Sequence, residues 1–152
     1  MVDISYWHFM DRPDTMPAGL LEAARSDLGQ VYDALERDLG GGDFVCGAFS
    51  IADIALFPHL VAVKALNVPF DKARHERLAG WLKRMREMAI CRDDVTRARA
   101  FVADLAGAGI ELKKIFWRGD RIEWMLARGY HQWFMGEIEA GRVIWPGLGV
   151  PT

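Results

Sequence analysis

The chain has few of the residues that build disulfide frameworks or metal sites. It contains two cysteines in 152 residues, Cys46 and Cys91, which are too few and too far apart for a disulfide scaffold or a zinc site. We expect both to be buried, unreactive thiols, as in proteins of a reducing compartment. The four histidines show neither HExxH spacing nor a neighbouring cysteine. The sequence therefore predicts no metal site.

Long hydrophobic runs are also missing. No N-terminal segment has the pattern of a signal peptide, and no run approaches the roughly 20 apolar residues of a membrane span. These absences predict a cytoplasmic protein without a membrane partner. The formal net charge is −2, but the first third of the chain is acidic and residues 72–99 are basic. Because the basic residues alternate with acids, as on a solvated helix face, we expect no nucleic-acid partner. Acidic and basic helices that pack together, within a subunit or across a dimer, explain the asymmetry more simply.

The sequence also lacks the motifs of a reaction centre. It has no G-x-S-x-G elbow, and the glycines at 40–42 precede no strand–helix unit that binds phosphate. His59 is expected on the side of a helix, and Arg74, His75 and Glu76 are expected in a solvated turn. We therefore predict no catalytic residue in this chain.

The most informative feature that is present is a helix start at Ser50. Asp53 follows three residues later, which is the spacing of a capping box in which each side chain bonds the other residue's main-chain N–H. Phe49 and Ile54 are placed to form a hydrophobic staple across this start. Loss of such a cap typically costs about 1 kcal/mol. The helix that follows has almost no polar face, which predicts burial on most sides, with a kink at Pro58.

Helical periodicity dominates the rest of the chain, and we draw no domain boundary within residues 1–152. The expected fold class is all-α, a helical bundle with short extra C-terminal helices and an extended tail. The expected helices cover residues 19–39, 51–66, 74–90, 93–106, 119–128 and 130–140, and the extended tail covers 142–146.

Three of these segments resemble the C-terminal, all-helical domain of glutathione transferases. The helix start is similar to that domain's F-x-x-G-x-x-S-I-A-D-I signature, which is the most specific of the three. Residues 78–85 resemble its next long helix, and Leu35, Glu36 and Leu39 resemble its L-E-x-x-L helix. The signature reads Phe44, Gly47, Ser50, Ile51, Ala52, Asp53 and Ile54 here. The resemblance extends from about Leu20 to about Cys91.

The resemblance implies a partner as well as a fold. Complete glutathione transferases begin with a thioredoxin-like domain that binds glutathione and carries the activating residue, and this chain shows no such region. The resemblance therefore implies that this chain holds no cofactor. Glutathione would be the co-substrate once the thioredoxin-like domain is supplied. The resemblance also implies an apolar electrophile pocket, for which the candidates are Tyr6, Trp7, Met10 and Trp117. Alternatively, these aromatic residues pack the tail onto the bundle or cover a surface that the missing domain would occupy.

Three functions remain open from the sequence. The chain is part of a glutathione transferase-like protein that contributes the pocket and dimer contacts and is inactive without its other half. Alternatively, it is a stand-alone protein–protein interaction module, because fold does not determine function. The third hypothesis is a non-catalytic carrier of apolar ligands that uses the same aromatic cleft. Whether the chain takes part in an enzyme is left undecided by the sequence.

Overall fold

The computed structural model describes residues 16–108, 115–116, 119–141 and 143–144. The regular secondary structure of the described part is almost entirely helical, which confirms the expected all-α class. Its elements are α2 (Leu20–Leu39), α3 (Ile51–Ala62), α4 (Glu76–Glu87), α5 (Ala89–Gly107), β1 (Ile115–Phe116), α6 (Gly119–Ala127), α7 (His131–Glu139) and β2 (Val143–Ile144).

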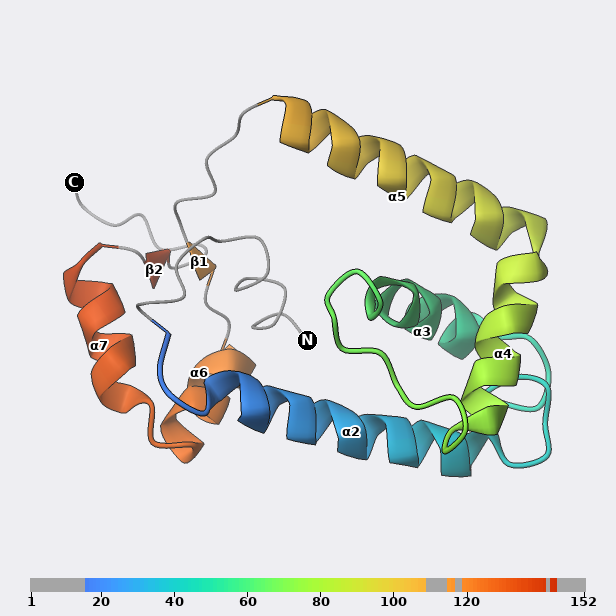
Figure 1. Cartoon of the computed structure of the whole chain (residues 1–152), viewed down its shortest axis with the longest axis horizontal. Helices are drawn as coiled ribbons and strands as arrows, with labels where there is room; N and C mark the ends of the chain where they lie inside the picture. The colour runs from blue at the N-terminus through green and yellow to red at the C-terminus, as the bar shows by residue number, and fades with distance from the viewer. Residues whose placement is uncertain (1–15, 109–114, 117–118, 142, 145–152) are drawn as a thin grey trace.

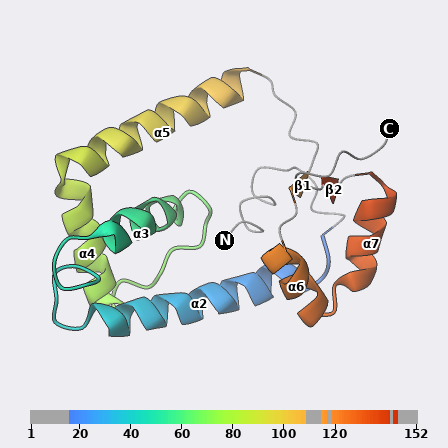
Figure 2. The same cartoon turned by 180° about the vertical axis from the view of Figure 1, so that it is seen from behind.

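The helices form two groups that share the long helix α2 (Figure 1). At the C-terminal end of α2, α4 packs against α2, α3 and the start of α5. At the other end of α2, α6 and α7 pack against each other. Helix α5 leaves α4 and runs along the edge of the molecule, away from α2 (Figures 1 and 2).

The main core is built around α4. Leu78, Trp81 and Met85 are completely buried, and they lie at the i, i+3 and i+7 positions of one helical face. The apolar faces of α2 and α3 close on this stripe, and Tyr32, Phe57 and Leu60 are among the residues that they contribute. Burial of such side chains away from water is the main stabilising term of the fold.

The expectation that the helix after Ser50 is buried on most sides is wrong. Only one stripe of α3, formed by Asp53, Phe57 and Leu60, is buried. Ile51 is 78% exposed and Ile54 is 50% exposed, although both are large apolar residues. The reason is tertiary, because α4 covers one face of α3 while α5 diverges from it.

Several helix boundaries also differ from the expected ones, and α4 covers Glu76–Glu87 instead of residues 74–90. Helix α3 ends at Ala62 instead of residue 66, and a turn follows in which Val68 N–H donates to the Val63 carbonyl at 2.9 Å. Asn67 has a φ of 55°, a left-handed conformation that asparagine tolerates and a helix does not. Helix α5 begins at Ala89 instead of residue 93, because Met88 adopts an extended conformation between two helices. Pro58 lies inside α3 without ending it.

A second, smaller core lies at the start of α2. Leu20 from α2, Met125 from α6 and Phe134 from α7 are buried together. Trp124 and Leu21 contact this cluster and also the main core, so the two cores are continuous. The expected extended tail contains β2, which pairs in parallel with β1, with Ile115 opposite Val143. The sequence pattern did not predict β1.

None of the described helices combines the length and the apolar character that a membrane crossing requires.

Candidate functional site

The capping signature builds a buried carboxylate centre at Asp53. The Asp53 side chain is fully buried, and its Oδ1 accepts hydrogen bonds from the Val45 N–H at 3.0 Å and from the Trp81 indole N–H at 2.8 Å. Its Oδ2 accepts from the Ser50 N–H at 2.9 Å and from the Ser50 hydroxyl at 3.1 Å. Both arms of the capping box are present, so the box that the sequence predicts is confirmed.

The hydrogen bonds at Asp53 keep it ionised. Burial raises the pKa of this carboxyl, but the donors from Val45, Trp81 and Ser50 outweigh burial and leave the pKa below its ordinary value. All four of these donors are neutral groups, so the charge is stabilised by dipoles and not by a salt bridge. Ser50 and Asp53 thus serve the main chain and the Trp81 indole, which leaves neither side chain free to act as a nucleophile or base.

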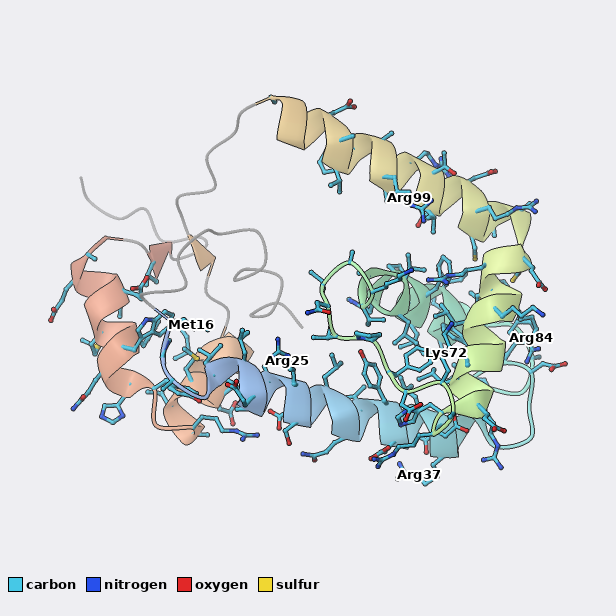
Figure 3. All side chains as sticks on the ribbon, in the orientation of Figure 1. Met16, Arg25, Arg37, Lys72, Arg84 and Arg99 are labelled. Carbon is cyan, nitrogen blue, oxygen red and sulfur yellow. The ribbon has the colours of Figure 1, made fainter. Side chains whose placement is uncertain are left out.

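The turn before α3 is held to α4 by a charged and aromatic contact. Arg84 Nε donates to the Asp43 carbonyl at 3.0 Å, and Arg84 Nη2 lies 2.9 Å from the Asp43 carboxylate. The guanidinium also sits over the Phe44 ring, 5.8 Å from its centroid. The Phe44 ring meets that of Phe49 edge-on, with centroids 5.5 Å apart. Figure 3 shows Arg84 on the outer side of α4, beside this turn.

The staple expected between Phe49 and Ile54 stays a prediction. Both side chains are partly exposed, Phe49 by 41% and Ile54 by 50%. The Phe49 ring contacts the Phe44 ring. Phe49, Ile51 and Ile54 therefore present an exposed apolar surface at the start of α3, which we call the α3 patch.

A second polar centre, built around a buried histidine, joins α2 to the start of α4. His75 is buried, with its Nδ1 3.0 Å from the Asp71 carbonyl oxygen and its Nε2 2.9 Å from Asp33 Oδ1. Arg74 pairs with the other Asp33 oxygen at 2.7 Å. The hydrogen bond from His75 and the charge of Arg74 lower the pKa of Asp33, against the opposing effect of burial. The expectation that residues 74–76 form a solvated turn is wrong for His75, because Tyr32 and Phe70 pack edge-on against its ring.

Glu36 caps α4 from a distance of about 41 residues along the chain. Its carboxylate accepts from the Arg77 N–H at 3.1 Å and from the Leu78 N–H at 2.9 Å. These are N–H groups of the first turn of α4, which have no partner within their own helix. A carboxylate at this end also faces the positive pole of the helix dipole. Asp33, one turn earlier on α2, pairs with Arg74, so an acidic part of α2 packs against a basic segment of the chain, as expected.

A third polar contact ties the C-terminal helices to α2. Asp27 accepts from the Trp124 indole N–H at 2.6 Å and also pairs with Arg128. The Arg128 guanidinium lies over the Trp124 ring, 5.5 Å from its centroid, and Tyr130 stacks on the same indole at 5.9 Å. The Trp124 ring is thus packed onto the bundle by its contacts with Asp27, Arg128 and Tyr130.

The residues predicted to line a substrate pocket lie outside the described part of the chain. This applies to Tyr6, Trp7, Met10 and Trp117, which therefore remain predictions. Sequence reasoning did not find the contacts of His75, Asp33 or Asp27, because their partners are about 40 to 100 residues away and no local spacing signals them.

The two cysteines differ in exposure. Cys46 is exposed, against expectation, whereas Cys91 is buried and its pKa is raised by burial and by Asp94. Within the described ranges, no group of histidine, cysteine and acidic side chains is arranged to hold a metal ion.

Residues 18–84 match the family model of the glutathione S-transferase C-terminal domain. This segment is therefore similar to that domain family. The matched segment spans α2, α3 and most of α4, which are the helices joined by Asp53, Glu36 and His75. No curated protein and no solved structure matches the chain significantly.

The three segments that resemble the family are held together by two carboxylates. The capping signature supplies Asp53, which accepts a hydrogen bond from Trp81 in the segment at residues 78–85. The L-E-x-x-L segment supplies Glu36, which caps that same helix at Leu78. The residues that carry the resemblance in sequence are therefore those that position α2, α3 and α4 relative to one another.

Proposed function

We propose that this chain supplies the helical half of a glutathione transferase-like protein, while a thioredoxin-like domain supplied elsewhere binds glutathione. The observation that carries the proposal is the family match over α2, α3 and α4. In this proposal the helical half contributes the apolar electrophile pocket and dimer contacts. The two free cysteines are compatible with the reducing cytoplasm as the place where it works.

The α3 patch supports a missing partner domain. Phe49, Ile51 and Ile54 are large apolar residues that remain exposed beside the most specific motif of the family. Grouped apolar side chains on a surface mark interaction sites more often than chance exposure does. We assign the thioredoxin-like domain to this patch, where its docking removes the exposed apolar area from water.

The chemistry of the described site supports inactivity without that partner. A transferase must lower the pKa of the glutathione thiol and hold the thiolate. The Ser50 hydroxyl donates to Asp53, and Asp53 is saturated by hydrogen bonds from main-chain and indole groups. Neither group is available to a bound thiol, so the activating residue belongs to the other domain.

Calorimetric titration of glutathione into the purified chain tests this proposal. We expect no saturable heat, because the tripeptide site lies on the partner. Glutathione-dependent turnover of an apolar chloronitrobenzene should be absent from the chain and appear when a matching thioredoxin-like domain is added. Saturable glutathione binding to the chain, or turnover without the second domain, would overturn the proposal.

The α3 patch also favours a second candidate, an interaction module that binds another protein without catalysis. The two candidates differ in what Ile51→Glu changes. In the transferase proposal, this substitution weakens docking of the thioredoxin-like domain and the turnover that depends on it. In the module, it weakens capture of a protein partner while glutathione has no effect. Since Ile51 is 78% exposed, the substitution leaves the fold intact, which circular dichroism checks.

A further inference from the structure

Helix α5 carries a self-complementary stripe on its exposed side. Ile90, Asp94, Arg97 and Phe101 are spaced by four, three and four residues, which places them within about 60° of one another around the helix. Ile90 is 64% exposed and Phe101 is 63% exposed, and the two charged residues between them are also exposed. Along this exposed face of α5, the stripe thus consists of an apolar, an acidic, a basic and an apolar residue in that order.

The unpartnered face results from the way α5 leaves the core. Cys91 is buried and Val95 packs against the main core, but residues 96–104 are all exposed. In both views of the molecule, α5 runs along the edge with α4 as its neighbour only at its start (Figures 1 and 2). The stripe of Ile90 and Phe101 also points away from Cys91 and Val95, because these pairs lie roughly 100° apart on the helix.

We propose that this stripe is a homodimer interface in which α5 of a second copy of the chain packs antiparallel on α5. The spacing of four, three and four is the same in both directions, so reversal places Ile90 against the partner's Phe101. The same register places Asp94 against the partner's Arg97, and the two-fold axis repeats both contacts. A two-fold interface requires this self-complementarity of a single surface.

The charges of Asp94 and Arg97 favour the antiparallel orientation and a second copy of this chain as the partner. A parallel copy would place Asp94 on Asp94 and Arg97 on Arg97, and like charges across an interface are unfavourable. The described residues include no ion pair from Asp94 or Arg97 within the chain, so both charges are available to a second copy. The contact lies outside the family match at 18–84. It gives the dimer contacts of the proposed function a location, and it requires neither glutathione nor a thioredoxin-like domain.

Sedimentation velocity over a concentration series tests this interface with the full chain. A single helix pair buries a small area, and interfaces below about 1,200 Å² are typical of weak, transient association. We therefore expect a reversible monomer–dimer equilibrium in the wild type. Asp94→Arg and Arg97→Asp each place like charges opposite one another at two positions, so each should raise the dissociation constant by about tenfold or more.

Mixing the two single variants gives the sharpest result. The stripe of Asp94→Arg is entirely basic and that of Arg97→Asp entirely acidic, so an equimolar mixture should form a heterodimer that neither variant forms with itself. The matched control is Arg99→Asp, which makes the same charge change on the opposite side of α5. Arg99 faces the α3 side (Figure 3), so this variant should dimerise like the wild type.

The outcomes separate this interface from its alternatives. A wild type that stays monomeric at every concentration overturns the proposal. A dimer that is insensitive to both charge reversals also overturns it, because the interface then lies elsewhere, as does a mixture that forms no heterodimer. Because all substituted side chains are exposed, circular dichroism should show unchanged helicity in every variant. Glutathione calorimetry on the same samples reports on the transferase proposal independently.

Discussion

The indole N–H of Trp81 donates a 2.8 Å hydrogen bond to Asp53 across 28 residues of sequence. Both side chains are fully buried. This bond makes a local helix cap part of the tertiary core, because the carboxylate that begins α3 also positions α4. The same carboxylate accepts from Val45 in the preceding turn. One buried charge thus joins the turn before α3, α3 itself and α4, and its removal should destabilise all three segments.

Replacing Asp53 with alanine should destabilise the fold strongly. The Val45 N–H, the Ser50 N–H and the Trp81 indole N–H would lose their acceptor, and each buried unsatisfied donor costs about 1–3 kcal/mol. We expect a loss of about 3 kcal/mol or more in the free energy of unfolding, measured by urea titration with circular dichroism. The control is Asp43→Ala, which removes an exposed ion pair with Arg84 and should cost at most about 1 kcal/mol. Equal effects of the two variants would contradict the role of Asp53.

Stability should fall with pH in the acid range because of the same carboxylate. The pKa of Asp53 lies below its ordinary value in the folded state, whereas in the unfolded chain an aspartate titrates near about 3.9. The unfolded state therefore binds more protons between these two values, so the unfolding free energy decreases as pH falls through that window. Above about pH 5 the contribution is complete.

The pH dependence can be assigned to Asp53 by substitution. In Asp53→Asn this site binds no proton in either state, so unfolding free energy measured in urea should vary less between pH 7 and pH 3. Asp43→Asn is the control and should retain the wild-type slope. An Asp53→Asn variant with an unchanged slope would show that the acid sensitivity arises from other groups.

His75 should be coupled energetically to Asp33. The ring bridges the Asp71 carbonyl and the Asp33 carboxylate and is packed by Tyr32 and Phe70. His75→Ala should cost about 2 kcal/mol, because it empties a buried position and removes the hydrogen bonds of the ring to Asp71 and Asp33. In a double-mutant cycle with Asp33→Ala, the two effects should be non-additive. A parallel cycle with Asp38→Ala, whose ion pair with Arg37 is exposed, should be additive; additivity in both cycles would remove the proposed link.

Two matched tryptophan substitutions should loosen different parts of the molecule. Trp124→Phe keeps an aromatic ring but removes the N–H that binds Asp27, so amide exchange should accelerate in α6 and α7. Trp81→Phe removes the corresponding bond to Asp53 and should accelerate exchange in α3 and α4. Hydrogen exchange followed by mass spectrometry resolves the two regions. Acceleration of all helices alike in both variants would contradict the view that each indole anchors its own group of helices.

Much of the fold could be predicted locally. Each described helix overlaps a helix expected from the sequence, and the Ser50–Asp53 spacing identified the cap before α3. Such features depend on residues within one or two turns of each other, so the sequence displays them directly. The end of α3 and the start of α5 were misplaced, because both depend on single backbone conformations at Asn67 and Met88.

The partners of these local elements were decided by the tertiary structure. Sequence spacing cannot show that Asp53 meets Trp81, that Glu36 caps Leu78, or that His75 is buried beside Asp33. It also cannot show that α3 and α5 diverge and leave Ile51 and Phe101 exposed. The sequence by itself determined the helices, the cap and the family resemblance. The packing of distant segments decided which charges are buried and which apolar faces stay open, because both depend on what other parts of the chain cover.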